Sequence, residues 1–167
     1  MTERLVVLEM AHVEARHLAR LVEQFAELLA ETAEAGEATP DDPAVARLVP
    51  DAYADDPDAS REFRSLTQRE LLDRRSTDAA TVLATLHSAA DPALADDEHT
   101  LTRMSIVELD PEALYAWLRT LAALRLVLAS RLGIQDEDDH DDQDPRFGIY
   151  DWLGYRLDGL VKAAEGA

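Results

Sequence analysis

The fold of this chain is decided by Asp110–Gly133, DPEALYAWLRTLAALRLVLASRLG. Asp110 and Pro111 make a strong helix start, because an aspartate N-cap accepts backbone hydrogen bonds and proline suits the first helical position. Gly133 is a natural stop, since glycine readily adopts the left-handed conformation found after many helices. Apolar residues lie on nearly every side of the segment between them, which is typical of a buried helix. We therefore predict a central helix over about 111–132.

The flanking segments also show helical periodicity. Residues 11–35 carry an apolar stripe and stop at Gly36, which favours a long amphipathic helix. A second stripe follows Pro145 and predicts a last helix over about 146–164. The stripe of the first helix consists of Val13, Leu18, Leu21, Val22, Phe25, Leu28 and Leu29. We expect it to pack into a core; the alternative is that Leu18, Leu21, Phe25 and Leu28 pair two copies as a homodimer.

Prolines break the segment that follows the first helix. Asp-Pro pairs predict short helices over 42–48 and 56–66, because each pair supplies an N-cap and a first helical residue. Thr67 has a glutamate three residues later, which is the spacing of a capping box. A separate helix is therefore expected over about 67–89. The polar, proline-containing stretch 91–99 is expected to form a loop.

Two short segments have the composition of strands. Residues 3–9 hold a run of Leu and Val, and residues 100–109 alternate in polarity. Each precedes a long helix, and an isolated pair of strands is unstable in water, so we expect both to lean on helices. The predicted fold class is mainly α, with one domain over 1–167. It is a bundle of five or six helices around the buried helix at about 111–132, with a small two-stranded β element.

Composition excludes several classes of protein. The 167 residues fit one domain, and 35 acidic against 16 basic residues give a net charge of −19. That charge disfavours unaided binding to duplex DNA, because phosphate contacts need clustered Lys and Arg. No cysteine is present, which excludes disulfides, thiolate nucleophiles and thiol redox switches. The chain shows no long apolar run and no signal-peptide pattern, so we expect a soluble cytoplasmic protein that binds no membrane.

No motif for catalysis or metal binding stands out. Nucleophile-elbow and phosphate-loop signatures are missing, so we predict no enzyme activity, no cofactor and no catalytic residue. The acidic segment 136–144 fails the calcium-loop template, because Asp141 and Phe147 stand where glycine and glutamate are needed. We interpret it as a solvated loop; the alternative is a metal-binding protein or enzyme that uses it. Structural or surface roles are expected for His12, His17, His87, His99 and His140.

One segment reverses the charge of the chain. Between residues 61 and 75, five arginines stand against three acidic residues. A local change of sign can mark a docking surface; the alternative is pairing with carboxylates along one helix. A helix-turn-helix is disfavoured, because the would-be reading helix over 78–86 has no Lys or Arg. The candidate partner-docking residues are Arg61, Arg64, Arg69, Arg74 and Arg75.

Three segments together resemble a known family. The first is DPAVARLVPDAY over 42–53, followed by DDP and then EFR at 62–64. The second is WLR at 117–119 with LRLVL at 124–128 and RLGI at 131–134, and the third is YDWL at 150–153. In order and spacing these segments are similar to the DUF2017 family of actinobacterial proteins, over roughly the whole length from Leu5 to Val161.

The resemblance implies a function but no site. Some members of the family carry the name oxidative-stress transcriptional regulator, which implies a regulator that works with RNA polymerase through a sigma factor. The resemblance implies no enzyme and assigns no functional residues. Because this chain has no cysteine, its sensing step is not thiol oxidation, and Met10 and Met104 offer the remaining sulfur chemistry. The charge of −19 favours a basic protein partner that delivers the chain to promoters.

Overall fold

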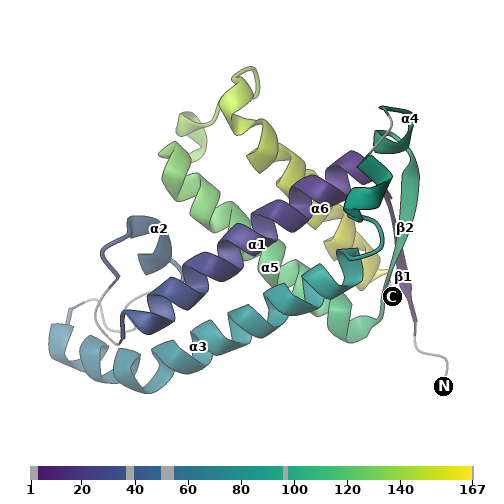
Figure 1. Cartoon of the computed structure of the whole chain (residues 1–167). Coiled ribbons are helices and arrows are strands. Elements are labelled where there is room, and N and C mark those ends of the chain that lie inside the picture. Colours follow the sequence, from purple (N-terminus) through teal and green to yellow (C-terminus); the bar gives the residue numbers. More distant parts are fainter. Residues whose placement is uncertain (1–3, 37–39, 50–54, 96–97, 167) are drawn as a thin grey trace.

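The computed structural model describes residues 4–36, 40–49, 55–95 and 98–166, and it is mainly α-helical as predicted (Figure 1). The α-helices are α1 (His12–Glu34), α2 (Pro43–Ala46), α3 (Pro57–Leu86), α4 (Glu98–Leu101), α5 (Pro111–Leu132) and α6 (Gly148–Glu165). Three short 3₁₀ helices are η1 (Pro92–Ala95), η2 (Glu137–Asp139) and η3 (Pro145–Phe147). The strands are β1 (Val6–Ala11) and β2 (Met104–Leu109).

Helix α5 is the central helix that its sequence predicts. The side chain of Asp110 accepts a 2.8 Å hydrogen bond from the Ala113 amide, and Gly133 ends the helix in the left-handed conformation at φ 74°. Trp117 and Leu121 are fully buried at its centre. By length and composition α5 is the one helix in the described ranges that suits a membrane span. Because 56% of its apolar window is buried inside the fold, it is better explained as a core helix.

The other long helices pack around α5. Helices α1 and α3 lie against each other, and α3, α6 and the short α2 contact α5 (Figure 1). The predicted apolar stripe of α1 enters this core through Leu18, Val22, Phe25 and Leu29, each at most 3% exposed. Burial of such side chains stabilises the fold by roughly 1.5–3 kcal/mol each. The expectation of core packing is therefore confirmed for these four residues, whereas Leu21 and Leu28 are half-buried and Val13 is exposed.

The two predicted strands pair with each other. β1 and β2 are antiparallel, with Val6 opposite Leu109 and Ala11 opposite Met104. Val107 and Leu109 are buried against the helical body, so the ribbon leans on helices as expected. The bounds of both strands differ from the prediction. β1 runs from Val6 to Ala11 in place of 3–9, of which residue 3 lies outside the described residues. β2 begins at Met104 in place of residue 100, because Thr100 and Leu101 belong to α4.

Two predicted boundaries are wrong. The expected helices over 56–66 and 67–89 are one continuous helix, α3, which begins after the N-cap Asp56. The Thr67 hydroxyl donates a 2.8 Å hydrogen bond to the Phe63 carbonyl inside that helix, so it caps nothing. No proline or glycine separates the two predicted helices, and the α-helical bonds therefore continue through the threonine. The expected loop at 91–99 contains the 3₁₀ turn η1 and the start of α4.

Glu14 ties the start of α1 to α6. Its carboxylate accepts hydrogen bonds from the Trp152 indole at 3.0 Å and from Arg156 Nη2 at 2.7 Å. The backbone amide of Ala11 donates a third, also at 3.0 Å. Burial alone would raise the pKa of Glu14, but these three hydrogen bonds and the charge of Arg156 outweigh it and lower the pKa below its ordinary value. The ionised form is therefore the one the fold stabilises.

Candidate functional site

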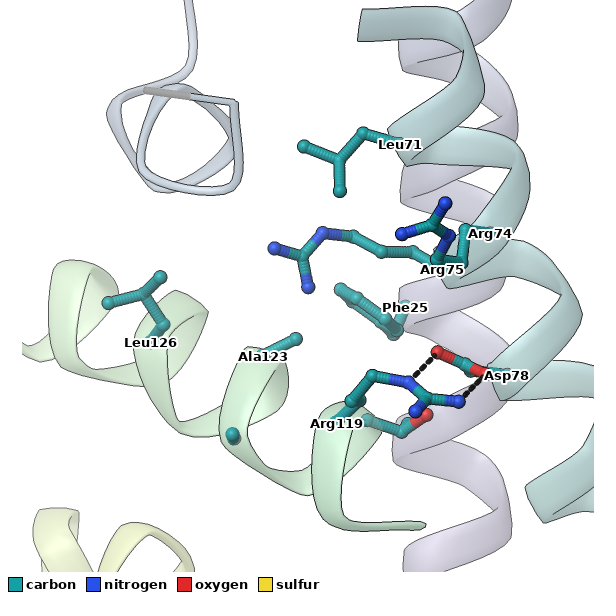
Figure 2. Close-up of a pocket in the computed structure, with 10 residues that line it drawn as sticks. Phe25, Leu71, Arg74, Arg75, Asp78, Arg119, Ala123 and Leu126 are labelled. Atoms are coloured by element: carbon teal, nitrogen blue, oxygen red, sulfur yellow. Dashed lines mark hydrogen bonds and ion pairs between the residues drawn. The ribbon is translucent and has the colours of Figure 1, made fainter. Parts of the chain in front are cut away.

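An arginine-bearing pocket lies between α3 and α5. It has a volume of about 340 Å³, and Phe25 of α1 contributes to its floor (Figure 2). Apolar side chains of α3 and α5, Leu71 and Leu126, line it together with three arginines. The arginines are Arg74, Arg75 and Arg119. A hollow with a positive lining is unusual for a chain of net charge −19.

Arg119 is fixed in the wall of this pocket by Asp78. Its Nε and Nη2 atoms donate two parallel hydrogen bonds of 2.7 Å to the two carboxylate oxygens of Asp78. These hydrogen bonds raise the pKa of Arg119 against the opposing effect of burial. A paired fork of this kind holds both side chains in one geometry. Arg119 therefore shapes the pocket, and much of its charge is neutralised.

Arg75 is the cation that extends into the pocket. In Figure 2 its side chain passes between Leu71 and Phe25. Its Nη2 atom donates one long hydrogen bond of 3.4 Å to the Leu48 carbonyl, and its buried Nε finds no partner among the described residues. Burial lowers the pKa of Arg75, and the nearby charge of Asp78 partly opposes that effect. This guanidinium is thus partly desolvated, with hydrogen-bonding capacity that the described part of the chain leaves unused.

Thr120 adds a second unused polar group. It lines the same pocket and is 2% exposed. Within the described ranges its Oγ1 atom has no hydrogen-bond partner. A buried hydroxyl without a partner costs roughly 1–3 kcal/mol, so most such groups in folded proteins are satisfied. The unsatisfied hydroxyl is covered by neighbouring atoms, so Arg75 is the polar group that the pocket offers to a ligand.

The five predicted docking arginines do not share one face. Arg64 is buried and Arg75 is half-buried, whereas the other three are exposed. Arg61 forms an ion pair with Asp58, and Arg74 Nη2 lies 3.3 Å from Glu70 Oε1. Both pairs run along α3, as the alternative interpretation of this segment expects. The exposed arginine without such a described pair is Arg69, and the docking role of the whole set stays a prediction.

The acidic segment 136–144 is a largely exposed loop that contains one short hydrogen-bonded turn, η2. Within η2, Asp136 accepts a hydrogen bond from the Asp138 amide at 2.9 Å, and Asp139 accepts from the Asp136 amide at 3.3 Å. Glu137 and Asp138 are exposed, and their side chains make no hydrogen bond or ion pair within the described chain. The turn joins α5 to α6 and carries its charge at one end of the molecule (Figure 1).

His140 lies between two carboxylates of this region. Its Nε2 is 2.6 Å from Asp151 Oδ1, and its Nδ1 is 3.2 Å from Asp142 Oδ1. One ligand atom from each of these residues lies within 4.8 Å of the others, a spacing that suits a metal ion. Asp151 comes from α6, so no short sequence motif contains all three residues of this cluster. Of the other histidines, His12 is buried and its Nδ1 donates to the Ala89 carbonyl at 2.6 Å, a structural role.

A second hollow lies on the other side of α5. It has a volume of about 310 Å³ and lies between α1 and α5. Leu21 and Leu28, the half-buried members of the α1 stripe, line it with Val127 and Leu128. The two remaining residues of the predicted dimer stripe, Leu18 and Phe25, are in the core. The homodimer stays a prediction.

Sequence reasoning did not find most of the arginine-bearing pocket. It named Arg74 and Arg75 but neither Arg119 nor Thr120, which belong to a helix predicted as pure core. The pairing of Arg119 with Asp78 joins residues 41 positions apart. No local pattern signals such a pair, because it depends on how α3 crosses α5.

The family expectation is confirmed. A model of the DUF2017 family, described as a domain of unknown function, matches residues 1–164, and the chain therefore belongs to this family. No curated protein and no solved structure matches the chain significantly.

Proposed function

We propose that this DUF2017 protein is a non-enzymatic regulator that acts in the cytoplasm by binding another protein. The partner is a component of the transcription machinery, a sigma factor or RNA polymerase, and the response concerned is oxidative stress. The resemblance to regulator-like family members motivates the identity of the partner. The net charge of −19 motivates its chemistry, because an acidic surface attracts a basic protein and repels bare DNA.

The ordered acidic turn is the observation that carries this proposal. Glu137 and Asp138 project from it without described partners of their own, so their charge is available to another molecule. Asp136 and Asp139 are occupied by backbone amides and hold the turn in place. A preorganised acidic surface loses less conformational entropy on binding than a disordered one. The exposed arginines of α3 remain candidate docking residues for acidic parts of the same partner.

A pull-down with purified components tests the proposal. Immobilised chain is incubated with purified sigma factors and RNA polymerase, with and without peroxide. We expect at least one factor to be retained, and we expect the E137Q/D138N double variant to retain less of it. The matched control is E23Q/E34Q, which removes the same charge from exposed positions on α1. Retention of no factor in either condition would reject the proposal.

A divalent-cation site is the second candidate function. His140, Asp142 and Asp151 supply one imidazole and two carboxylates, a donor set that suits zinc or manganese. Against it, both imidazole nitrogens already contact carboxylates, so the cluster is satisfied without a cation.

Calorimetric titration decides between these interpretations of the cluster. If it binds a metal, zinc or manganese gives a saturable heat that H140A abolishes. A flat trace at millimolar metal removes this candidate.

A further inference from the structure

We propose that the pocket between α3 and α5 binds a small organic carboxylate with an apolar body. The carboxylate lies against the guanidinium of Arg75, and the apolar body lies on Phe25, Leu71 and Leu126 (Figure 2). This ligand site goes beyond the proposed binding of a protein partner and does not depend on it.

The charge of the ligand follows from the pairing of the three arginines. Arg119 is neutralised by the bidentate contact with Asp78, and Arg74 is paired with exposed Glu70. Arg75 is left as the cation with unused donors. The single guanidinium of Arg75 matches a ligand with one negative charge. A planar carboxylate also fits the fork of a guanidinium, which can donate two parallel hydrogen bonds to it.

The open donors of Arg75 indicate where the carboxylate lies. Among the described residues its guanidinium makes one long hydrogen bond, from Nη2 to the Leu48 carbonyl. The side chain is half-buried and lines the pocket, so a ligand carboxylate can accept from the donors that this bond leaves unused.

The apolar lining of the pocket indicates the chemistry of the part of the ligand beyond its carboxylate. Phe25 is 3% exposed and offers an aromatic surface, and the leucines line the pocket beside it. A volume of about 340 Å³ lies at the lower end of the range for small-molecule sites. An aryl or medium-chain carboxylate therefore fits better than a nucleotide or a free phosphate, neither of which would use the apolar surface.

Binding of 3-phenylpropionate to the purified full chain tests this proposal. Chemical-shift changes in amide and methyl spectra are followed on titration. We expect saturable shifts at Leu71, Leu126 and Thr120, and weaker binding of the neutral analogue 3-phenylpropan-1-ol and of acetate. Each probe separates one part of the claim, since the alcohol lacks the charge and acetate lacks the apolar body.

Two variants make the test specific to the pocket. R75M keeps the apolar stem and removes the charge, and we expect affinity to fall about tenfold or more. R75K keeps the positive charge but loses the planar fork, with an expected loss of several-fold; it serves if R75M does not fold. R69M is the control, because that exposed arginine on the same helix does not line the pocket.

Three outcomes would overturn the carboxylate site: no saturable shift with 3-phenylpropionate, shifts that map elsewhere, or equal affinity for the alcohol. Equal affinity in wild type, R75M and R75K would do so as well. The outcome is separate from that of the sigma-factor pull-down, since no protein partner is present in this titration.

Discussion

Trp117 donates a 2.8 Å hydrogen bond from its indole nitrogen to the hydroxyl of Thr85, and this bond joins the centre of α5 to α3. The indole is fully buried, so its one donor would otherwise be left without a partner in the core. The hydroxyl of Thr85 thus satisfies the one polar atom of the Trp117 side chain within the apolar core. The contact also fixes the register of the two helices that form the arginine-bearing pocket.

Replacing Thr85 tests that contact. T85V keeps the shape of the side chain but removes the acceptor, so the buried indole N–H loses its partner. We expect the free energy of unfolding to fall by about 1–3 kcal/mol. Urea denaturation measures it, and T81V on an outer part of α3 is the control, with an expected effect of about 0.5 kcal/mol or less. Equal effects of the two substitutions would contradict a special role for the bond.

The continuity of α3 can be tested at Thr67. If this threonine were an N-cap, T67A would cost about 1 kcal/mol. Because it lies inside the helix, where alanine has the higher helix propensity, we expect T67A to be neutral or stabilising by a few tenths of a kcal/mol. D56A removes the cap that the structure shows and should cost about 1 kcal/mol. Thermal unfolding of both variants shows which substitution costs more stability. A larger loss for T67A than for D56A would support two separate helices.

Glu14 gives the fold a dependence on acidic pH. Its folded-state pKa lies below the ordinary value of 4.5, so the unfolded state binds more protons as the pH falls past that value. The stabilisation is therefore present above about pH 4.5 and is lost as the pH falls through the lower folded-state pKa. We expect E14Q to be less stable than wild type at neutral pH. The difference should shrink on acidification, and a constant difference in urea denaturation from neutral to low pH would be evidence against it.

The ion pair in the pocket wall should contribute modestly to stability. R119M leaves the nearly buried Asp78 without its bidentate partner, and we expect a loss of about 1–2 kcal/mol. The loss is modest because half of the Arg119 side chain is exposed to solvent, which screens the ion pair. R69M, at an exposed position of α3, serves as the matched control and should stay near wild type. Chemical denaturation measures the free energy of unfolding of both variants. Equal values for R119M and R69M would contradict a stabilising role for the ion pair.

Strong local signals explain what could be predicted of the fold. Asp110-Pro111 and Gly133 bound the central helix within a residue, because capping chemistry acts through neighbouring groups. The same kind of signal wrongly predicts a helix start at Thr67, where the spacing of a capping box occurs inside a helix. A cap motif needs an interruption of the preceding helix to act, and this sequence supplies none there.

The candidate sites could be predicted only in part. The local charge indicates Arg74 and Arg75, but their places in the pocket depend on the packing of α3 against α5. Thr120 carries no signal, since its unsatisfied hydroxyl is a property of the packed core. His140 approaches Asp151 only because α6 folds back beside the acidic turn. Contacts between distant elements are what a single sequence leaves undetermined.

The central claim, that the chain works through an acidic surface that binds a basic protein of the transcription machinery, is tested most directly by one titration. Fluorescently labelled chain is titrated with each purified sigma factor, with RNA polymerase and with bare promoter DNA at low and high salt. We predict saturable anisotropy for at least one protein, weakened by salt and by E137Q/D138N more than by E23Q/E34Q, and none for DNA alone. Tight binding to the bare DNA, or no response to any protein, would contradict it.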